Sequence, residues 1–234
     1  MAGIFTSLVR KVPQLISITT PKFNTLSALR TLSVSSPLCS ARVRQPAPNF
    51  EGMACIEDNF KKIKLSDYAG KYVLLVFYPL DFTFVCPTEL IALEQMYDEF
   101  HKLDCEVIAI SVDSHYTHLA WQHTPRDQGG VGKLRFPLLS DINKNIAKDY
   151  GVLLEDEGVA LRGMFLIDSH GLLRVTQIND LSIGRSTEEA LRLVGAIKAV
   201  EEFGEVCPAN WKTGSKTIKP DPVGSKEYFK TVHT

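Results

Sequence analysis

The feature that most constrains the fold is the longest apolar run of the chain, Tyr72 to Leu80. Its β-branched and aromatic residues are typical of a strand that is buried on both faces of a sheet. Pro79 ends this strand, because proline has no N–H to donate to the next strand. The run is about half of the roughly 18–20 apolar residues that a membrane-spanning helix needs. It therefore predicts a central strand in a globular protein and no membrane span.

The segments that follow predict an alternation of helices and strands. We expect helices at 87–100, 115–123, 142–150 and 186–203, and strands at 106–112, 162–168 and 172–178. The four residues from Asp168 to Gly171, at the junction of the last two strands, end in glycine and suit a hairpin turn. Ser186 is expected to cap the last helix together with Glu189. This order predicts an α/β sheet with helices on both faces, followed by an extended tail from Gly204.

The charge of the chain changes near residue 45. Six basic residues precede the first acidic residue, Glu51, and the first forty residues hold twelve serines and threonines. Apolar residues between Ile4 and Ile16 recur at helical spacing, which makes one apolar face. Such a composition is typical of a mitochondrial transit peptide, whereas a secretory signal would need a compact apolar core. We therefore expect residues 1–45 to be a removed leader to the mitochondrial matrix, with the cut within residues 38–46.

Composition and cysteine spacing exclude several classes of protein. Of 234 residues, 44% are hydrophobic and 23% charged, which suits a folded domain, and a net charge of −1 does not favour a nucleic-acid partner. Five cysteines without a Cys-x-x-Cys pair lack the spacing of a zinc site or a thioredoxin-type motif. We expect no metal, and we expect Cys105 to be an ordinary buried thiol.

Cys86 occupies a special place in the predicted fold. It follows the end of the central strand and begins the next helix, where unpaired N–H groups and the helix dipole favour a thiolate. We therefore expect its pKa to lie below the free value of about 8.5. The hydroxyl of Thr83 could bond the sulfur or a bound oxygen. The spacing alone leaves open that Cys86 is a buried structural cysteine at a strand-to-helix corner.

Two longer motifs carry a family resemblance. The segment 77–89, FYPLDFTFVCPTE, resembles the active-site signature of typical 2-Cys peroxiredoxins, and 204–211, GEVCPANW, resembles their resolving-cysteine motif. The resemblance covers essentially all of residues 46–234. It implies a thioredoxin-like fold over 46–204, with a central mixed sheet flanked by helices, and a tail over 205–234 that carries the second cysteine.

The resemblance also implies roles for single residues. Cys86 would be the peroxidatic cysteine, which reduces a hydroperoxide and becomes sulfenic acid. Pro79 would shield the sulfur, Thr83 would hold the peroxide, and Arg162 would stabilise the thiolate and the leaving oxygen. A supporting ionic network would orient this arginine through two further residues, Glu89 and Arg185.

In this family Cys207 would come from the partner subunit and close a disulfide with Cys86. That pairing implies a homodimer, which the family often assembles into a ring of five dimers. Thioredoxin would reduce the disulfide by thiol exchange. No cofactor is implied, because the sulfur carries both electrons. We interpret His115 and His118 as surface or interface residues.

Two more segments resemble members of the family that are sensitive to overoxidation. The glycines Gly129, Gly130 and Gly132 match a Gly-Gly-Leu-Gly loop in which this chain has Val131, and Tyr228 and Phe229 match a Tyr-Phe pair in the tail. Their packing would slow disulfide formation, so that a second peroxide could reach Cys86. The aromatic pair could also simply anchor the C-terminus.

The sequence also bears on two functions other than that of a peroxidase. A ring-forming chaperone or redox-relay partner is compatible with the sequence, and the family is known to combine such roles. A protein-disulfide oxidoreductase is disfavoured, because Cys86 has no second cysteine three residues later.

Overall fold

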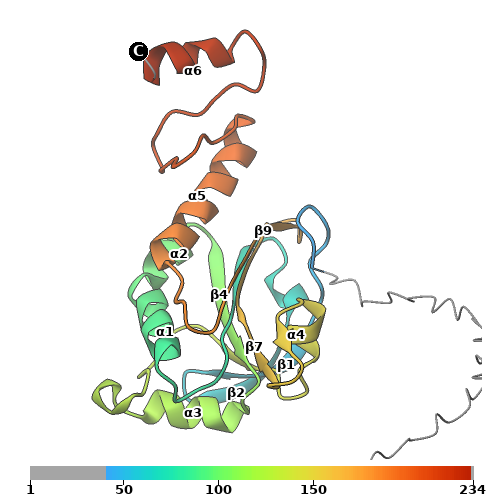
Figure 1. Cartoon of the computed structure of the whole chain (residues 1–234), viewed down its shortest axis with the longest axis vertical. Coiled ribbons are helices and arrows are strands. Elements are labelled where there is room, and N and C mark those ends of the chain that lie inside the picture. Colours follow the sequence, from blue (N-terminus) through green and yellow to red (C-terminus); the bar gives the residue numbers. More distant parts are fainter. Residues whose placement is uncertain (1–40, 233–234) are drawn as a thin grey trace, which may run out of the picture. The chain divides into compact units, whose positions relative to one another are not determined.

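The computed structural model describes residues 41–232, and most of the expected leader lies outside them. A seven-stranded sheet with the order β2-β1-β5-β4-β3-β8-β9 forms its centre (Figure 1). Its strands are β1 (Glu51–Ile56), β2 (Asn59–Lys64), β3 (Tyr72–Phe77), β4 (Cys105–Ser111), β5 (Leu138–Ser140), β8 (Arg162–Ile167) and β9 (Leu173–Asn179). Two short strands, β6 (Leu153–Leu154) and β7 (Val159–Ala160), pair with each other.

Helices lie on both faces of the sheet. They are α1 (Val85–Gln95), α2 (Tyr97–Lys102), α3 (His115–His123), α4 (Asn145–Asp149), α5 (Thr187–Phe203) and α6 (Ser225–Val232), with 3-10 turns η1 (Leu65–Tyr68) and η2 (Arg126–Gln128). Helices α1 and α2 lie on the opposite face from α4 in Figure 1. No helix among the described residues is long and apolar enough to span a bilayer.

Strand β3 is the buried strand that the apolar run predicts. It pairs in parallel with β4 and antiparallel with β8, so the sheet is mixed. All six of its residues are buried, and their side chains alternate between two apolar cores. Leu74 and Val76 pack in the core that includes residues of α1, α2 and α5, whereas Leu75 and Phe77 pack in the core that includes α4. The expected mixed sheet flanked by helices is confirmed.

The expected helices are present with different boundaries. The predicted helix 87–100 is two helices, because the backbone leaves helical geometry at Met96 (φ −103°, ψ 9°), and α1 begins at Val85. Helix α4 is shorter than expected. Ser186 caps α5 by accepting a hydrogen bond from the Glu189 N–H at 3.1 Å. The Glu189 carboxylate bonds Arg192 instead of turning back to the cap.

Three parts of the fold differ from the expectation or were not predicted. The antiparallel hairpin of β1 and β2 was not predicted, nor was β5. The tail is not extended throughout, because residues 225–232 form α6. The hairpin turn between β8 and β9 is confirmed, with Gly171 at φ +80° and its N–H donating to the Asp168 carbonyl.

The first described residues contact this hairpin. The Arg44 N–H donates to the Leu173 carbonyl at 2.7 Å, and Pro46 forms an isolated bridge with Leu172. Ala41 is buried in the core on the α4 side of the sheet. The chain is therefore part of the packed domain from about residue 41.

Candidate active site

Cys86 lies where the sequence places it, at the start of a helix that follows the central strand. It is the second residue of α1, and its thiol is fully buried (0% exposed). A short loop from residue 78 to 84 connects it to β3. The first turn of a helix presents unpaired N–H groups and the positive end of the helix dipole. The backbone around this sulfur therefore favours a negative charge.

Arg162 brings a full positive charge to the same sulfur. It is the first residue of β8, which pairs with β3, and its side chain is 4% exposed. The Nη1 atom lies 3.4 Å from the Cys86 Sγ and 2.9 Å from a Glu89 carboxylate oxygen. The Nε–H donates to the Leu181 carbonyl at 2.7 Å, which fixes the plane of the guanidinium. A fixed cation at a buried sulfur stabilises the thiolate, because screening by water is weak there.

Glu89 links Arg162 to a second arginine. Its carboxylate accepts hydrogen bonds at 2.8 Å from the N–H, Nε and Nη2 of Arg185, while the Arg185 Nη1 donates to the Gly163 carbonyl. Burial alone would raise the pKa of Glu89, but these hydrogen bonds and the two arginine charges lower it below its ordinary value. The carboxylate is thus ionised at neutral pH. Two cations and one anion leave a net positive charge beside the sulfur.

The loop before Cys86 has its own anchors. The Thr83 hydroxyl donates to the Leu80 carbonyl at 2.9 Å, so its proton does not point to the sulfur. Phe82 adopts a positive φ of +53°, and the Asp81 N–H donates to Asp113 at 2.9 Å. Pro79 stands at the head of this loop, directly after the central strand. The hydroxyl oxygen of Thr83 keeps lone pairs with which it can accept a hydrogen bond from a bound peroxide.

A buried network that the sequence did not reveal holds the same loop. The Asp81 carboxylate accepts the Tyr78 hydroxyl at 2.7 Å and contacts the His118 Nδ1 at 2.8 Å. His118 is fully buried, so its assignment as a surface or interface residue is wrong. Burial raises the pKa of Asp81, although the bond to His118 opposes this effect. His118 comes to Asp81 only through the fold, and no local sequence pattern predicts this contact.

The site is closed in this structure. The Cys86 sulfur is fully buried, whereas Phe84 and Phe82 in the adjoining loop are 91% and 50% exposed. The sulfur is therefore shielded from solvent in this conformation. The closed packing excludes bulk water from the sulfur and strengthens its interaction with Arg162.

Cys207 is not brought to Cys86 within one chain. Its sulfur contacts the Ala196 carbonyl of α5 at 3.6 Å. Arg185, which binds Glu89 in the site, lies just before the start of α5. Ala196 lies about 15 Å from that end along the helix, at 1.5 Å per residue. A disulfide requires α-carbons within about 7 Å. Burial raises the pKa of Cys207, and the charge of Arg192 partly offsets that rise.

The glycine loop and the aromatic pair also lie apart within one chain. In Figure 1, α6 lies beyond one end of α5, whereas α3 and the loop that follows it lie at the opposite end of the domain. Gly130 packs so closely that an added Cβ would fall 1.8 Å from the Thr124 carbonyl oxygen. Val131 is fully buried, and the rings of Tyr228 and Phe229 lie edge to face with centroids 5.6 Å apart.

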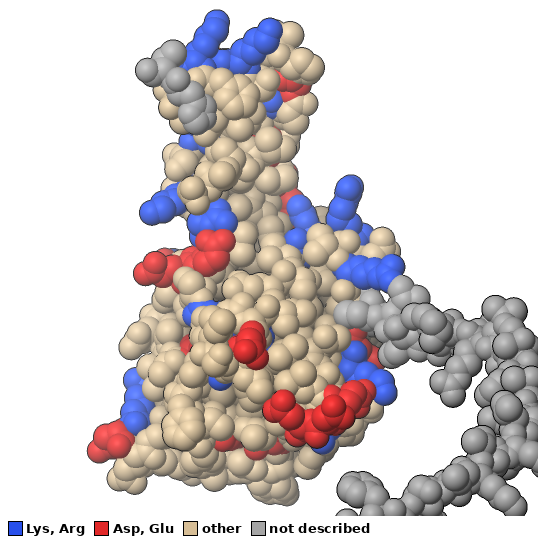
Figure 2. Space-filling model, viewed as in Figure 1, with Lys and Arg blue, Asp and Glu red and all other residues tan. Residues whose placement is uncertain are grey.

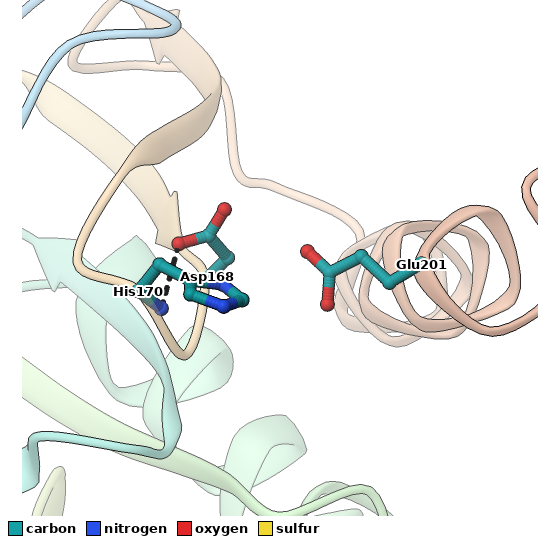
Figure 3. Close-up of side chains that lie close together, drawn as sticks. All are labelled: Asp168, His170 and Glu201. Carbon is teal, nitrogen blue, oxygen red and sulfur yellow. Dashed lines mark hydrogen bonds between the residues drawn. The ribbon is translucent and has the colours of Figure 1, made fainter.

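One cluster of the described residues has the donor types of a metal site. Asp168, His170 and Glu201 converge where α5 approaches the β8–β9 turn, as Figure 3 shows. However, the Arg174 Nη1 lies 3.0 Å from Asp168 and 2.6 Å from Glu201, where a cation would bind. The Asp168 carboxylate also accepts the N–H of His170 and of Leu172. We interpret the cluster as an ion-pair network that ties α5 to the sheet.

The surface charge is mixed. On the face drawn in Figure 2, acidic and basic side chains are interspersed over the sheet domain, and basic ones predominate around α6. This pattern agrees with the small net charge of the sequence. The expectation of no nucleic-acid partner stays a prediction.

Known proteins resemble the chain over most of its length. Residues 43–176 match the AhpC/TSA family, and residues 196–231 match the C-terminal domain of 1-Cys peroxiredoxin. Peroxiredoxin-2 of Bos taurus is 59% identical over 82% of this chain and 96% of its own. The mitochondrial thioredoxin-dependent peroxide reductase of Drosophila melanogaster is 51% identical over 98% of both chains. A crystal structure of reduced 2-Cys peroxiredoxin from Plasmodium vivax, 48% identical, superposes with a TM-score of 0.78 over 80% of this chain and 98% of its own.

Proposed function

The chain belongs to the AhpC/TSA family of peroxiredoxins, and from this premise we propose how its residues make it a thioredoxin-dependent peroxidase. The observation that carries the proposal is the 3.4 Å contact between Arg162 and the Cys86 sulfur at a helix N-terminus. The Cys86 thiolate attacks one oxygen of a hydroperoxide, and the O–O bond breaks. The sulfur becomes sulfenic acid, and the other oxygen leaves as water or alcohol once it is protonated. Two electrons pass from sulfur to oxygen, so the step needs no further cofactor.

The surrounding residues stabilise charge and orient the peroxide. Arg162 holds the thiolate and then the charge that develops on the leaving oxygen. Glu89 and Arg185 fix the direction of that guanidinium. Thr83 accepts a hydrogen bond from the peroxide, and Pro79 shields the sulfur from water. These roles require the loop from 79 to 84 to open enough for the peroxide to enter.

Cys207 of a partner subunit resolves the sulfenic acid. This assignment is supported by the contact of the Cys207 sulfur with Ala196 of α5, whereas Cys86 lies in α1 beside Arg162 of the same chain. The resulting disulfide is reduced by thioredoxin, as the name of the Drosophila relative states for that protein. The working unit is thus a homodimer, and we extend the proposal to a ring of five dimers. In that assembly the glycine loop at Gly129, Gly130 and Gly132 would meet the partner's aromatic pair, residues 228 and 229.

Relatives named as mitochondrial support a mitochondrial location, and we propose the matrix as the compartment. The basic, serine-rich segment 1–45 would be the leader, 46–204 the thioredoxin-like domain and 205–234 the tail with the resolving cysteine. Within the expected range of 38–46, the contacts of Ala41 and Arg44 with the domain favour a cut before residue 41, so that residues 41–45 would stay on the mature domain and the removed leader would end before them.

The test compares three cysteine variants after exposure to peroxide. Cys86→Ser should abolish thioredoxin-dependent peroxide consumption, and Cys207→Ser should prevent the covalent dimer on a non-reducing gel. Cys105→Ala is the matched control, because burial raises the pKa of that thiol and keeps it unreactive. Full turnover in Cys86→Ser would overturn the assignment. A covalent dimer that persists in Cys207→Ser would overturn the resolving role alone.

A further inference from the structure

The segment that carries Cys207 is a closed loop that folds back along α5. Val206 and Ile218 exchange two backbone hydrogen bonds of 2.9 Å and close its ends. The Thr217 hydroxyl bonds the Glu205 carboxylate, and the Trp211 Nε1–H donates to the Ser215 carbonyl at 3.1 Å. We call residues 205–218 the strap. Because its ends are paired, it opens as a unit and not residue by residue.

The strap is seated on a glycine of α5. Trp211 is 4% exposed although it lies in the tail, and its ring lies over Gly195. A Cβ at Gly195 would fall 2.8 Å from the Thr213 Oγ1 and 3.9 Å from the indole. The missing side chain therefore lets the strap approach the helix closely, which brings the Cys207 sulfur to the Ala196 carbonyl.

Arg192 links the strap to α5. Its Nε and Nη2 donate to both oxygens of Glu189 at 2.6 and 2.8 Å, and its Nη1 donates to the Trp211 carbonyl at 2.9 Å. The Ser186 hydroxyl caps the N–H of Glu189, so the carboxylate is itself held in place. The Arg192 side chain is 24% exposed. A charge-assisted hydrogen bond in this position is stronger than one between neutral groups.

An open pocket lies between the strap, α5 and α2. Asn210, Lys212 and Thr213 of the strap line this pocket of about 750 Å³ together with Arg192 of α5 and Lys102 of α2. On the side of α2 the strap therefore has room to move. The helix α5, through Arg192 and Gly195, is the surface from which it must detach.

We propose that Arg192 is a positioning residue for the resolving step, which it slows by holding the strap on α5 through the Trp211 carbonyl. The inference rests on the proposed function, in which Cys207 reacts with the Cys86 sulfenic acid of a partner subunit. In that step the S–S bond forms, the S–O bond breaks, and the hydroxide takes the thiol proton and leaves as water. The sulfur of Cys207 contacts α5 in the closed strap, so opening must precede this attack.

The contact between Arg192 and the Trp211 carbonyl also sets how long the sulfenic acid survives. While Cys207 is held, a second hydroperoxide can oxidise Cys86 to sulfinic acid, which does not form a disulfide. Arg192 therefore shifts the balance from disulfide towards sulfinic acid as the peroxide concentration rises. The same contact leaves the first reaction at Cys86 unaffected, because it touches none of the residues around that sulfur.

The test separates the two steps by rapid quench and mass analysis of the Cys86 states. Arg192→Met removes all three hydrogen bonds of the guanidinium, including the one to the strap, and the charge, whereas Trp211→Leu loosens the strap and keeps the charge. Both should form the disulfide about fivefold faster, the factor that corresponds to about 1 kcal/mol for one hydrogen bond. Sulfenic acid should form at the wild-type rate, and less sulfinic acid should accumulate at high peroxide.

Lys198→Met is the matched control, because Lys198 lies on the same helix but binds the Leu103 carbonyl and Asp104. It should leave the ratio of disulfide to sulfinic acid unchanged. Slower disulfide formation in Arg192→Met would overturn the proposal and would point to activation of the Cys207 thiolate instead. Wild-type protein that never forms the Cys86–Cys207 disulfide would overturn the proposed function and not this inference alone.

Discussion

At the scale of single residues, the geometry of one guanidinium decides the reactivity of the site. Arg162 contacts sulfur, carboxylate and carbonyl at once, and a lysine ammonium cannot span these three partners. We expect Arg162→Lys to lower the second-order rate constant of Cys86 with peroxide about 100-fold, the loss typical of one oxyanion donor. Stopped-flow kinetics under thiol-free conditions measure this directly. A rate within twofold of wild type would show that charge alone suffices.

Glu89 makes a second residue-scale prediction, which concerns pH. Its folded pKa lies below the ordinary value, so its ionised form stabilises the fold at neutral pH and loses that effect as the pH falls through the folded pKa. Glu89→Gln leaves two buried arginines without their anion and should cost about 3 kcal/mol of the free energy of unfolding. Urea unfolding should show this difference in the free energy of unfolding between wild type and variant at pH 7. The difference should shrink below about pH 4.

The control for this variant is an exposed carboxylate. Glu99 pairs with Lys102 on the surface, where both side chains are more than half exposed. Glu99→Gln should leave the unfolding midpoint unchanged at pH 7, because exposed ion pairs contribute little. A gap for Glu89→Gln that widens as the solution becomes more acidic would contradict the assigned direction of the pKa shift.

At the scale of elements, the glycine loop is set by backbone packing. An alanine Cβ at Gly130 would fall 1.8 Å from the Thr124 carbonyl oxygen, whereas nothing lies within 4 Å of one at Gly129. Gly130→Ala should therefore cost about 3 kcal/mol or force the loop to rearrange. Gly129→Ala should cost about 1 kcal/mol, because its φ of +84° strains an L-residue. Thermal unfolding of the two variants gives the comparison, and equal losses would refute it.

The secondary-structure elements also show which parts of the fold can be predicted from the sequence. The strands at 72–78 and 106–112 were predictable, because uninterrupted β-branched runs mark strands buried on both faces. The β1–β2 hairpin was not, since Gly52, Ala54 and a lysine-rich second strand carry no alternating pattern. Helix α6 was missed because the tail before it is rich in proline, glycine and lysine, and none of the eight residues of α6 is buried in the core.

The candidate site likewise has some features that the local sequence predicts and others that depend on contacts between distant residues. The position of Cys86 at a helix start follows from local signals, namely a strand, a proline and an amphipathic segment. The contact of Arg162 with this sulfur depends on the pairing of β3 with β8 across more than 70 residues, which only the family resemblance indicated. The burial of His118 depends on Asp81, 37 residues away, so neither periodicity nor composition reveals it.

At the scale of the whole molecule, the two edges of the sheet differ. Strand β2 contains Lys61, Lys62 and Lys64, and these charges disfavour pairing with another strand. Strand β9 at the other edge pairs with β8 and, at Leu173 alone, bonds residues 44 and 45 among the described residues; Ile178 further along it is 43% exposed. In the proposed homodimer, we therefore expect the second copy of the chain to join at β9.

This difference yields a prediction that ties assembly to chemistry. Adding lysines with Thr176→Lys and Ile178→Lys should turn the dimer into monomers at micromolar concentration, because like charges then face each other across the edge. Sedimentation velocity measures the state, and Asn59→Lys on β2 is the matched control, expected to remain dimeric. Since Cys207 must reach the Cys86 of a partner in the proposed scheme, the monomer should lose the peroxide-induced disulfide and accumulate sulfinic acid. A monomer that still forms the Cys86–Cys207 disulfide would place both cysteines within reach in one chain and refute the intersubunit scheme.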